Sequence, residues 1–161
     1  MMIKPYDRSK AVAYAEKWAL GRNPAYYDFQ NIGGDCTNFV SQCLYAGAGV
    51  MNFTPDTGWY YRSVNDRAAA WTGVEYLFRF LVLNQGAGPF ARTVHAAETE
   101  IGDIIQLGSE TGNYYHSLFV TATQPTILVC AHTFDVRNRP LYEYSWPQIR
   151  FLHIAGVRTP Y

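Results

Sequence analysis

The sequence has few cysteines, no excess of either charge and no long apolar run. Its 161 residues contain three cysteines, and because this number is odd, a complete disulfide framework within the chain is excluded. No two cysteines have the Cys-x-x-Cys spacing of a zinc ribbon. The 13 basic residues balance the 13 acidic ones, which argues against a surface for nucleic acid or for an anionic membrane.

The lack of a long apolar run bears on cellular location. No stretch reaches the roughly 18 apolar residues that a membrane span needs, so we expect no transmembrane helix. The opening segment "MMIKPYDRSK" lacks the apolar core of a secretion signal. As written, the sequence predicts a soluble chain. An extracellular or cell-wall location would need a leader ahead of these residues and a cytoplasmic one would not, so the compartment stays open.

The chain is rich in aromatic residues. They make up 16% of it and include 13 tyrosines and 4 tryptophans. Such residues suit a β-rich core, and they also suit a groove that holds an extended polymer such as a peptide or a glycan. A chain of this length can bury one sizeable core, and no repeat or linker divides it. We therefore expect a single domain over residues 1–161.

Hydrophobic periodicity predicts helices in the first half and strands in the second. The helices are expected from Ser9 to Leu20, from Cys36 to Ala46, and along an apolar face from Trp71 to Leu81 that Asn65 or Asp66 would cap. Strands are expected to begin near Gly102, His116, Thr126 and Gln148. This order predicts an α+β fold in which N-terminal helices pack on a C-terminal antiparallel β-sheet.

Cys36 is a candidate nucleophile because it follows "GGD" and begins the second predicted helix. The first turn of a helix lowers the pKa of a thiol, and its unpaired N–H groups can hold an oxyanion. Gly33 and Gly34 would leave space above the sulfur, and Asp35 would cap the helix or orient a group in the site. A buried structural thiol fits the local sequence equally well.

A cysteine nucleophile needs a base, and imidazole is the usual one. His116 stands at the start of a predicted strand, from which its side chain can reach a helix start. His132 closes the next strand, and either His132 or Thr133 would face His116 across a hairpin, depending on a one-residue register. His95 and His153 are expected to be surface or core polar residues.

Other arrangements of reactive residues have less support. Cys43 lies in the middle of a predicted helix and Cys130 within an apolar strand, so both are expected in the core. A metal site would need His116, His132 and Asp135 to converge, and no spacing typical of a metal motif is present. We therefore expect no metal or organic cofactor.

Five segments, taken in order, resemble one family. They are "YDRSKAVAYAEKWAL", "DCTNFVSQCLYAGAG", "GDIIQL", "YYHSLFVT" and "AHTFDVRNRPL". Together, from about Tyr6 to Leu141, they resemble the putative amidase domain family, which is related to the NlpC/P60 and CHAP cysteine peptidases. The resemblance implies a papain-like fold with a catalytic cysteine at a helix start, a histidine at a strand start and a third polar residue on the next strand.

Carried onto this chain, the resemblance implies catalytic roles for Cys36, His116 and His132. Asp135 and Asn138 are rivals of His132 for the third place, because they follow it in a polar turn, and the resemblance does not decide among them. The candidate substrate-binding residues are Asp35, Tyr27, Trp59 and Tyr60, with Tyr26 as the alternative to Tyr27 for an oxyanion donor and Tyr61 as a further aromatic contact.

The predicted function is therefore a cysteine-dependent amidase or peptidase. The resemblance implies a thioester intermediate and a substrate among bacterial cell-wall peptides or muropeptides. Acyl transfer by the same thiol is one alternative, since it passes through the same intermediate. A binding module on a non-catalytic version of the fold is another, and it would leave Cys36 unreactive. The bond cleaved and the oligomeric state stay open.

Overall fold

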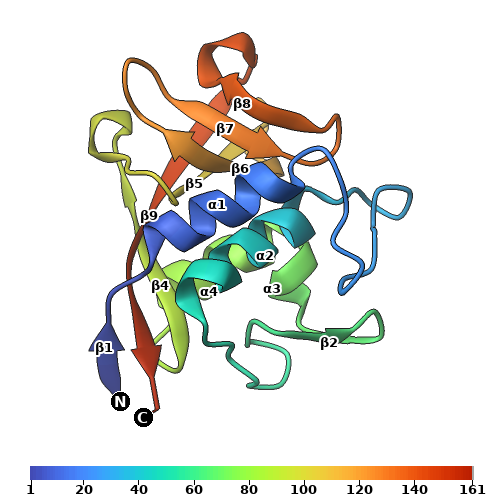
Figure 1. The fold of residues 1–161 in the computed structure, drawn as a ribbon, viewed down its shortest axis with the longest axis vertical. Helices are drawn as coiled ribbons and strands as arrows, with labels where there is room; N and C mark the ends of the chain where they lie inside the picture. The colour runs from blue at the N-terminus through green and yellow to red at the C-terminus, as the bar shows by residue number, and fades with distance from the viewer. Residues whose placement is uncertain (161) are drawn as a thin grey trace.

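The computed structural model describes residues 1–160 and has a mixed α/β fold around one large antiparallel sheet (Figure 1). The strand order is β1-β9-β5-β6-β7-β8, and β4 pairs with β9. The strands of this sheet are β1 (Met2–Lys4), β4 (Gly88–Val94), β5 (Ile104–Gly108), β6 (Tyr114–Ala122), β7 (Leu128–Ala131), β8 (Val136–Pro140) and β9 (Gln148–Thr159).

The helices precede most of the sheet in sequence and gather on one of its faces (Figure 1). They are α1 (Arg8–Trp18), α2 (Cys36–Ala48), α3 (Ala69–Thr72) and α4 (Val74–Leu83), with short 3-10 turns at Ala96–Glu98 and Leu141–Glu143. A small hairpin, β2 (Tyr61–Ser63) with β3 (Asp66–Arg67), lies between α2 and α3. The observed architecture thus has the predicted order of helices followed by an antiparallel sheet.

Helix α2 is the centre of the helical layer. All of its residues except Tyr45 and Ala46 are buried, including four polar ones. Asn38 donates to the carbonyl of Tyr27 and Ser41 donates to the carbonyl of Trp71. A buried polar side chain with a hydrogen-bond partner avoids the desolvation cost of an unpaired one. These bonds therefore fix α2 against its neighbours and hold its first turn in place.

The ends of α1 and α2 follow the sequence closely. Asp7 caps α1 by accepting from the amide of Lys10. Gly49 ends α2 in the left-handed conformation, with φ of 68°. Gly47, which the sequence suggests as a stop, lies inside α2 instead. A Cβ there would come within 2.5 Å of the Tyr6 ring, so glycine allows the start of α1 to approach α2 closely.

Two apolar layers flank the sheet. The larger lies on the helical side and includes Phe39, Leu44, Trp71 and Phe119. The smaller lies on the opposite side, where Leu107, Leu118 and Val129 contact residues that follow β8, such as Leu141. Strand β6 takes part in both layers, because alternate side chains of a strand point to opposite faces.

Several predicted elements differ from the structure. Asn65 and Asp66 do not cap a helix, because they lie in the β2–β3 hairpin, and the expected third helix is divided at Gly73 into α3 and α4. Strands β1, β4 and β8 do not stand out from the sequence. Strand β8 ("VRNRP") lies at the edge of the sheet and is mostly half-buried, so it lacks a clear apolar alternation.

Candidate active site

Cys36 and His116 line one pocket of about 410 Å³ at the start of α2. Three parts of the chain complete its wall: the Gly33–Gly34 pair before α2, strands β5 and β6, and the segments on either side of β8. The pocket therefore lies where the helical layer meets the upper strands of the sheet in Figure 1.

Cys36 is the first residue of α2, and only 7% of its surface is exposed. Burial raises the pKa of the Cys36 thiol, while the backbone amide of Ser117 and the hydroxyl of Thr37 act in the opposite direction. The thiol is thus protonated at neutral pH in the unliganded protein. Its sulfur lies 3.8 Å from the Thr37 hydroxyl.

The two glycines before α2 open the space beside the sulfur, as expected. Gly33 and Gly34 have φ values of 81° and 94°, in the left-handed region that glycine adopts without strain. A Cβ at Gly33 would meet nothing within 4 Å, whereas one at Gly34 would lie 3.1 Å from the Thr133 hydroxyl. The loop therefore borders the pocket with backbone rather than side chains.

His116 lies near the start of β6, opposite Leu107 of β5. Burial lowers the pKa of His116 to about 4, so the ring is neutral and can accept a proton at neutral pH. Its ring centroid lies 6.2 Å from that of Tyr144. Within residues 1–160 no hydrogen bond joins the His116 ring to Cys36, so the two groups share a pocket without direct bonding in this unliganded state.

Asp35 neither caps α2 with its side chain nor reaches substrate, but its carboxylate does orient another side chain, His132. It occupies the N-cap position of α2, but its side chain makes no capping bond and is fully buried. One carboxylate oxygen accepts from the amides of Phe29 and Asn38 at 2.8 and 2.9 Å. The other lies 2.5 Å from Nδ1 of His132 and 3.6 Å from Nε of Arg22. The prediction that Asp35 binds substrate is therefore wrong, because its oxygens are enclosed by the protein.

His132 points away from His116. Its Nδ1 bonds with Asp35, and its Nε2 lies 2.9 Å from the carbonyl oxygen of Trp18. Its ring stacks on Phe39, with centroids 4.0 Å apart. The expected role of His132 in orienting His116 is thus corrected: both ring nitrogens have other partners, and the residue fastens the start of α2 to the end of β7.

His132 and Thr133 lie in the turn that follows β7, beyond the pairing of β6 with β7. That pairing extends as far as Phe119 with Cys130, and Thr133 has a φ of 62°, which is not a strand conformation. Thr133 and His116 both line the pocket. Of the two alternatives left open by the sequence, Thr133 is therefore the residue that shares the pocket with His116, and His132 does not line that pocket.

The two rivals for the third catalytic place also have other partners. Asp135 forms two bonds with the guanidinium of Arg22, at 2.8 and 3.1 Å. Asn138 accepts from the Thr121 hydroxyl at 2.6 Å. In the part of the chain that the structure describes, neither residue contacts His116. His153, as expected, is a buried polar residue, and its Nδ1 lies 2.9 Å from Asp103.

The aromatic residues predicted to hold substrate lie outside this pocket. Trp59 is fully buried and donates from its ring N–H to Ser41, so it is part of the core and the prediction for it is wrong. Tyr60 borders a different cavity, with Asp56 and Arg67. Tyr26 and Tyr27 border a shallow hollow beside Tyr61, so neither is placed to donate to an oxyanion at Cys36.

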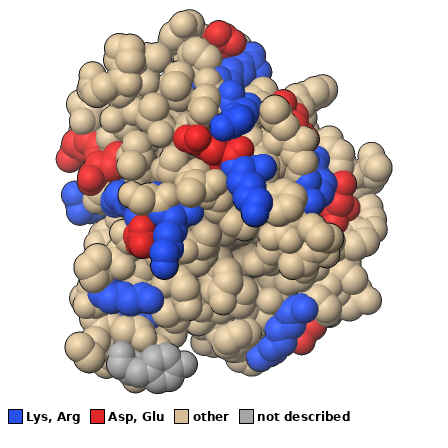
Figure 2. All heavy atoms as spheres, in the orientation of Figure 1, with Lys and Arg blue, Asp and Glu red and all other residues tan. Residues whose placement is uncertain are grey.

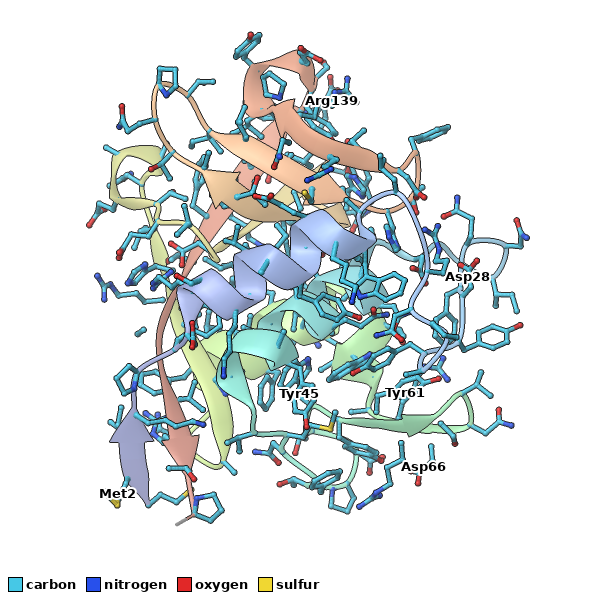
Figure 3. The ribbon with its side chains drawn as sticks, viewed as in Figure 1. Met2, Asp28, Tyr45, Tyr61, Asp66 and Arg139 are labelled. Atoms are coloured by element: carbon cyan, nitrogen blue, oxygen red, sulfur yellow. The ribbon has the colours of Figure 1, made fainter. Side chains whose placement is uncertain are left out.

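The structure reveals pocket residues that the sequence does not single out, namely Phe134, Arg139, Tyr144 and Ser145. Arg139 is the cation among them, and its guanidinium lies 4.3 Å above the ring of Tyr144. Figure 3 shows Arg139 beside β8, well separated from Tyr61 and Asp66 near the β2–β3 hairpin. The polar run "VRNRP" is the feature of the sequence that marks this segment.

Two properties of the described residues bear on other classes of function. Among residues 1–160, no group of three or more histidine, cysteine, aspartate or glutamate side chains is arranged to hold a metal ion. No helix within that range has the length and apolar character to cross a membrane.

Comparison with known proteins places the chain in a family. A family model described as "Putative amidase domain" matches residues 5–154. The chain belongs to this family. The amidase domain is also 39% identical, over 166 aligned positions, to the uncharacterized protein YhbB of Bacillus subtilis (strain 168). That match takes in 96% of the domain and 52% of YhbB, so the chain spans about half the length of this relative. No solved structure matches the domain significantly.

Proposed function

We propose that this domain is a cysteine-dependent amide hydrolase with Cys36 as nucleophile and His116 as general base. The observation that carries the proposal is the shared pocket: the first residue of a buried helix and a histidine near a strand start converge there from distant parts of the sequence. The family name points to amide hydrolysis, and we extend it to a thiol mechanism on this geometry.

The proposed reaction begins with transfer of the Cys36 proton to His116, which is neutral and able to accept it. The sulfur attacks the amide carbonyl, and the backbone N–H of Cys36 at the start of α2 holds the resulting oxyanion. His116 returns its proton to the leaving amine, so the C–N bond breaks and a thioester remains. Water, deprotonated by His116, then releases the acid and restores the thiol.

We further propose a peptide substrate of the bacterial cell wall. Stem peptides in such polymers carry free carboxylates, and Arg139 supplies a cation to the wall of the pocket. The kinship implied by the sequence motifs with the NlpC/P60 and CHAP peptidases, and with their papain-like fold, belongs to the same proposal. In this account residues 1–161 act as one catalytic domain, and His132 supports the site through Asp35.

A digestion experiment tests the proposed function. Purified muropeptides are incubated with the domain, and the products are followed by mass spectrometry. We expect a new amine and a new carboxylic acid from one amide bond, and no product from the Cys36→Ala variant. The Cys43→Ala variant, altered at a buried thiol away from the pocket, should retain activity. Equal activity in the Cys36→Ala variant would contradict the proposal.

The same experiment separates hydrolysis from acyl transfer. Added hydroxylamine competes with water for the thioester. The hydroxamate reports the thioester in either case, and the products without hydroxylamine separate the two activities. We expect a free carboxylic acid from a hydrolase, whereas coupling to a second peptide amine would show a transferase.

A further inference from the structure

A chain of buried polar side chains runs from the sulfur of Cys36 into the sheet. Thr37 Oγ1 lies 3.8 Å from Cys36 Sγ and 3.0 Å from Ser117 Oγ. Ser117 Oγ lies 3.1 Å from Nε2 of Gln106 on β5. All three polar residues are almost fully shielded from solvent. Because Thr37 follows the proposed nucleophile and Ser117 follows His116, this chain connects the two halves of the site.

At the far end of this hydrogen-bond chain, the amide of Gln106 has a fixed orientation. Arg150 donates from Nε and Nη2 to Oε1 of Gln106, at 2.9 and 2.7 Å. The Nε2 of Gln106 also donates to the carbonyl of Val74 at 3.0 Å. A rotated amide would turn its NH₂ toward the guanidinium and its oxygen toward a carbonyl. The contacts on both sides therefore allow only one orientation of the Gln106 amide.

Arg150 is itself held firmly. Its guanidinium carbon lies 3.6 Å from the ring centroid of Phe78 and 3.8 Å from that of Tyr114. Nη2 also pairs with Glu75 at 2.9 Å. Ring contacts and an ion pair on one guanidinium restrict its motion. The group that orients Gln106 is thus itself immobile.

The orientation of Gln106 determines the direction of each hydroxyl. Gln106 donates to Ser117, whose own hydrogen then has the Thr37 oxygen as its acceptor. If Ser117 accepted from both neighbours, its hydrogen would be buried without a partner, at a cost in free energy. The oxygen of Thr37 accepts the bond from Ser117, and its own hydrogen is left for the sulfur of Cys36.

We infer that Gln106, Ser117 and Thr37 form a directed hydrogen-bond chain that ends on the sulfur of Cys36 and stabilises its thiolate. The inference rests on the proposed function, because it assigns a role to the sulfur as nucleophile. Thr37 donates to the reacting atom, while Ser117 and Gln106 are positioning residues that act through it. No proton travels along the chain: the Cys36 proton goes to His116, and the Thr37 bond strengthens as charge develops on sulfur.

Several charged and titratable groups around the sulfur must be considered when the pKa of Cys36 is tested. The charged and titratable groups of the surrounding elements are Asp35 before α2, Tyr115 and His116 on β6, Arg139 on β8 and Tyr144 after the 3-10 turn that follows β8. Burial is the main cause of the raised pKa of Cys36, Asp35 adds to it, and the Thr37 hydroxyl opposes it. Loss of the Thr37 bond should therefore raise this pKa further.

The pH dependence of Cys36 alkylation measures this effect without any substrate. Iodoacetamide reacts with the thiolate, and mass spectrometry of the Cys36 peptide separates its labelling from that of buried Cys43 and Cys130. In the Thr37→Val variant we expect the midpoint of labelling to rise by about one pH unit. Thr37→Ser should keep the native midpoint, and so should Thr121→Val, which removes a hydroxyl elsewhere on β6.

A substitution at Gln106 tests the direction of the chain. In Gln106→Glu the side chain can only accept, so Ser117 turns its hydrogen toward it, Thr37 turns toward Ser117, and the sulfur loses its donor. The labelling midpoint should rise as in Thr37→Val. In the double variant the two shifts should not add, whereas an effect of the new charge through space would add to the first.

The outcomes distinguish this inference from the proposed function. A native midpoint in a Thr37→Val protein whose circular dichroism is unchanged would overturn the hydrogen-bond chain while leaving Cys36 reactive. A rise of the same size in Thr37→Ser would overturn it as well. If Thr37→Val does not fold, a native labelling midpoint in Gln106→Glu would overturn it instead. A wild-type Cys36 that fails to react at any pH would instead remove the proposed function.

Discussion

At the scale of single residues, burial determines the protonation of the proposed pair. It lowers the pKa of His116 to about 4 and raises that of the Cys36 thiol, so both groups are neutral at pH 7. A neutral imidazole beside a neutral thiol favours proton transfer as the substrate arrives, rather than a preformed ion pair. The site is therefore a general-base arrangement in its unliganded state.

The neutral state of His116 and Cys36 at pH 7 predicts how the rate of the reaction depends on pH. Because His116 takes up a proton only near pH 4, activity should persist through pH 6 and fall as the pH drops through about 4. His116→Gln should lose about 100-fold or more of the rate at pH 7, and the difference should narrow above the pKa of the thiol, where hydroxide removes the proton. Rates measured from pH 3.5 to 10 check this, and an acidic limb near 6.5 would contradict it.

The same residue predicts a dependence of stability on pH. The folded protein holds His116 at a pKa of about 4, below the usual value of 6.5, so the unfolded chain binds the proton first as the pH falls. The contribution of this residue is complete above about pH 6.5 and is lost toward pH 4. Between pH 7 and 4.5 it should amount to about 2 kcal/mol after allowance for partial exposure.

Urea unfolding at both pH values provides the measurement. The His116→Gln variant should lack this part of the loss of stability, while His95→Gln, altered at an exposed histidine, should behave as the wild type does. An identical pH dependence in the wild type and in His116→Gln would show that the ring is not held neutral by burial.

At the scale of elements, Asp35 and His132 join the loop before α2, the helix itself and the end of β7. Asp35 accepts hydrogen bonds from Phe29 and Asn38 and also bonds with His132. The other ring nitrogen of His132 lies within hydrogen-bond distance of the carbonyl of Trp18 at the end of α1. A buried carboxylate with several donors fixes the backbone on which it sits. The position of Cys36 thus depends on side chains that never reach the pocket.

Replacement of Asp35 should therefore cost more than replacement of an exposed carboxylate. Asp35→Asn removes the carboxylate beside the buried His132 ring, while Arg22 keeps Asp28 and Asp135, and we expect it to lower the free energy of unfolding by about 3 kcal/mol. Asp135→Asn, at the more exposed partner of Arg22, should cost about 1 kcal/mol or less. Urea denaturation distinguishes the two, and equal losses would contradict a structural role specific to Asp35.

Much of the element order follows from local patterns, whereas the partners of polar side chains do not. The start of α2 at Cys36 and its stop at Gly49 follow from helix periodicity and from the left-handed preference of glycine. Strand β8 was missed because its side chains are polar and lie at an edge. The contact of His132 with Asp35 joins residues 97 positions apart, and His132 lies in a turn after β7 whose direction no local pattern in the sequence indicates.

Some residues of the candidate site can likewise be predicted from the sequence, and others cannot. The types of residue and their places at a helix start and a strand start were open to prediction, and the structure brings Cys36 and His116 to one pocket. The sequence predicts that the aromatic residues of the loop after α2 bind substrate, because it does not show that Trp59 fills the core. Arg139 and Tyr144 reach the pocket only through the packing of the segment that ends the sheet.

At the scale of the whole molecule, charge does not direct the approach of substrate over long distances. The formal net charge is zero, and Figure 2 shows basic and acidic side chains interspersed over the visible face. Recognition must then depend on groups near the pocket, where Arg139 is the cation. Carboxylates on a substrate would bind at short range rather than through a general field.

Arg139→Gln should accordingly change recognition more than chemistry. We expect KM for a carboxylate-bearing peptide to rise about tenfold with little change in kcat, because one charged hydrogen bond is lost. An amidated form of the same peptide should be affected much less. Arg137→Gln, on the same strand but outside the pocket lining, is the matched control. An equal loss with both peptides would contradict a carboxylate contact.

The most direct test of the account is acylation of Cys36 by an activated ester, because it needs no knowledge of the natural substrate. p-Nitrophenyl acetate is mixed with the domain at pH 7, and mass spectrometry locates the acetyl group. We predict a burst of p-nitrophenolate, with acetyl on Cys36, that is much slower in His116→Gln. An absent adduct on Cys36, or a burst that is indifferent to His116, would contradict the central claim that these two residues form a catalytic pair.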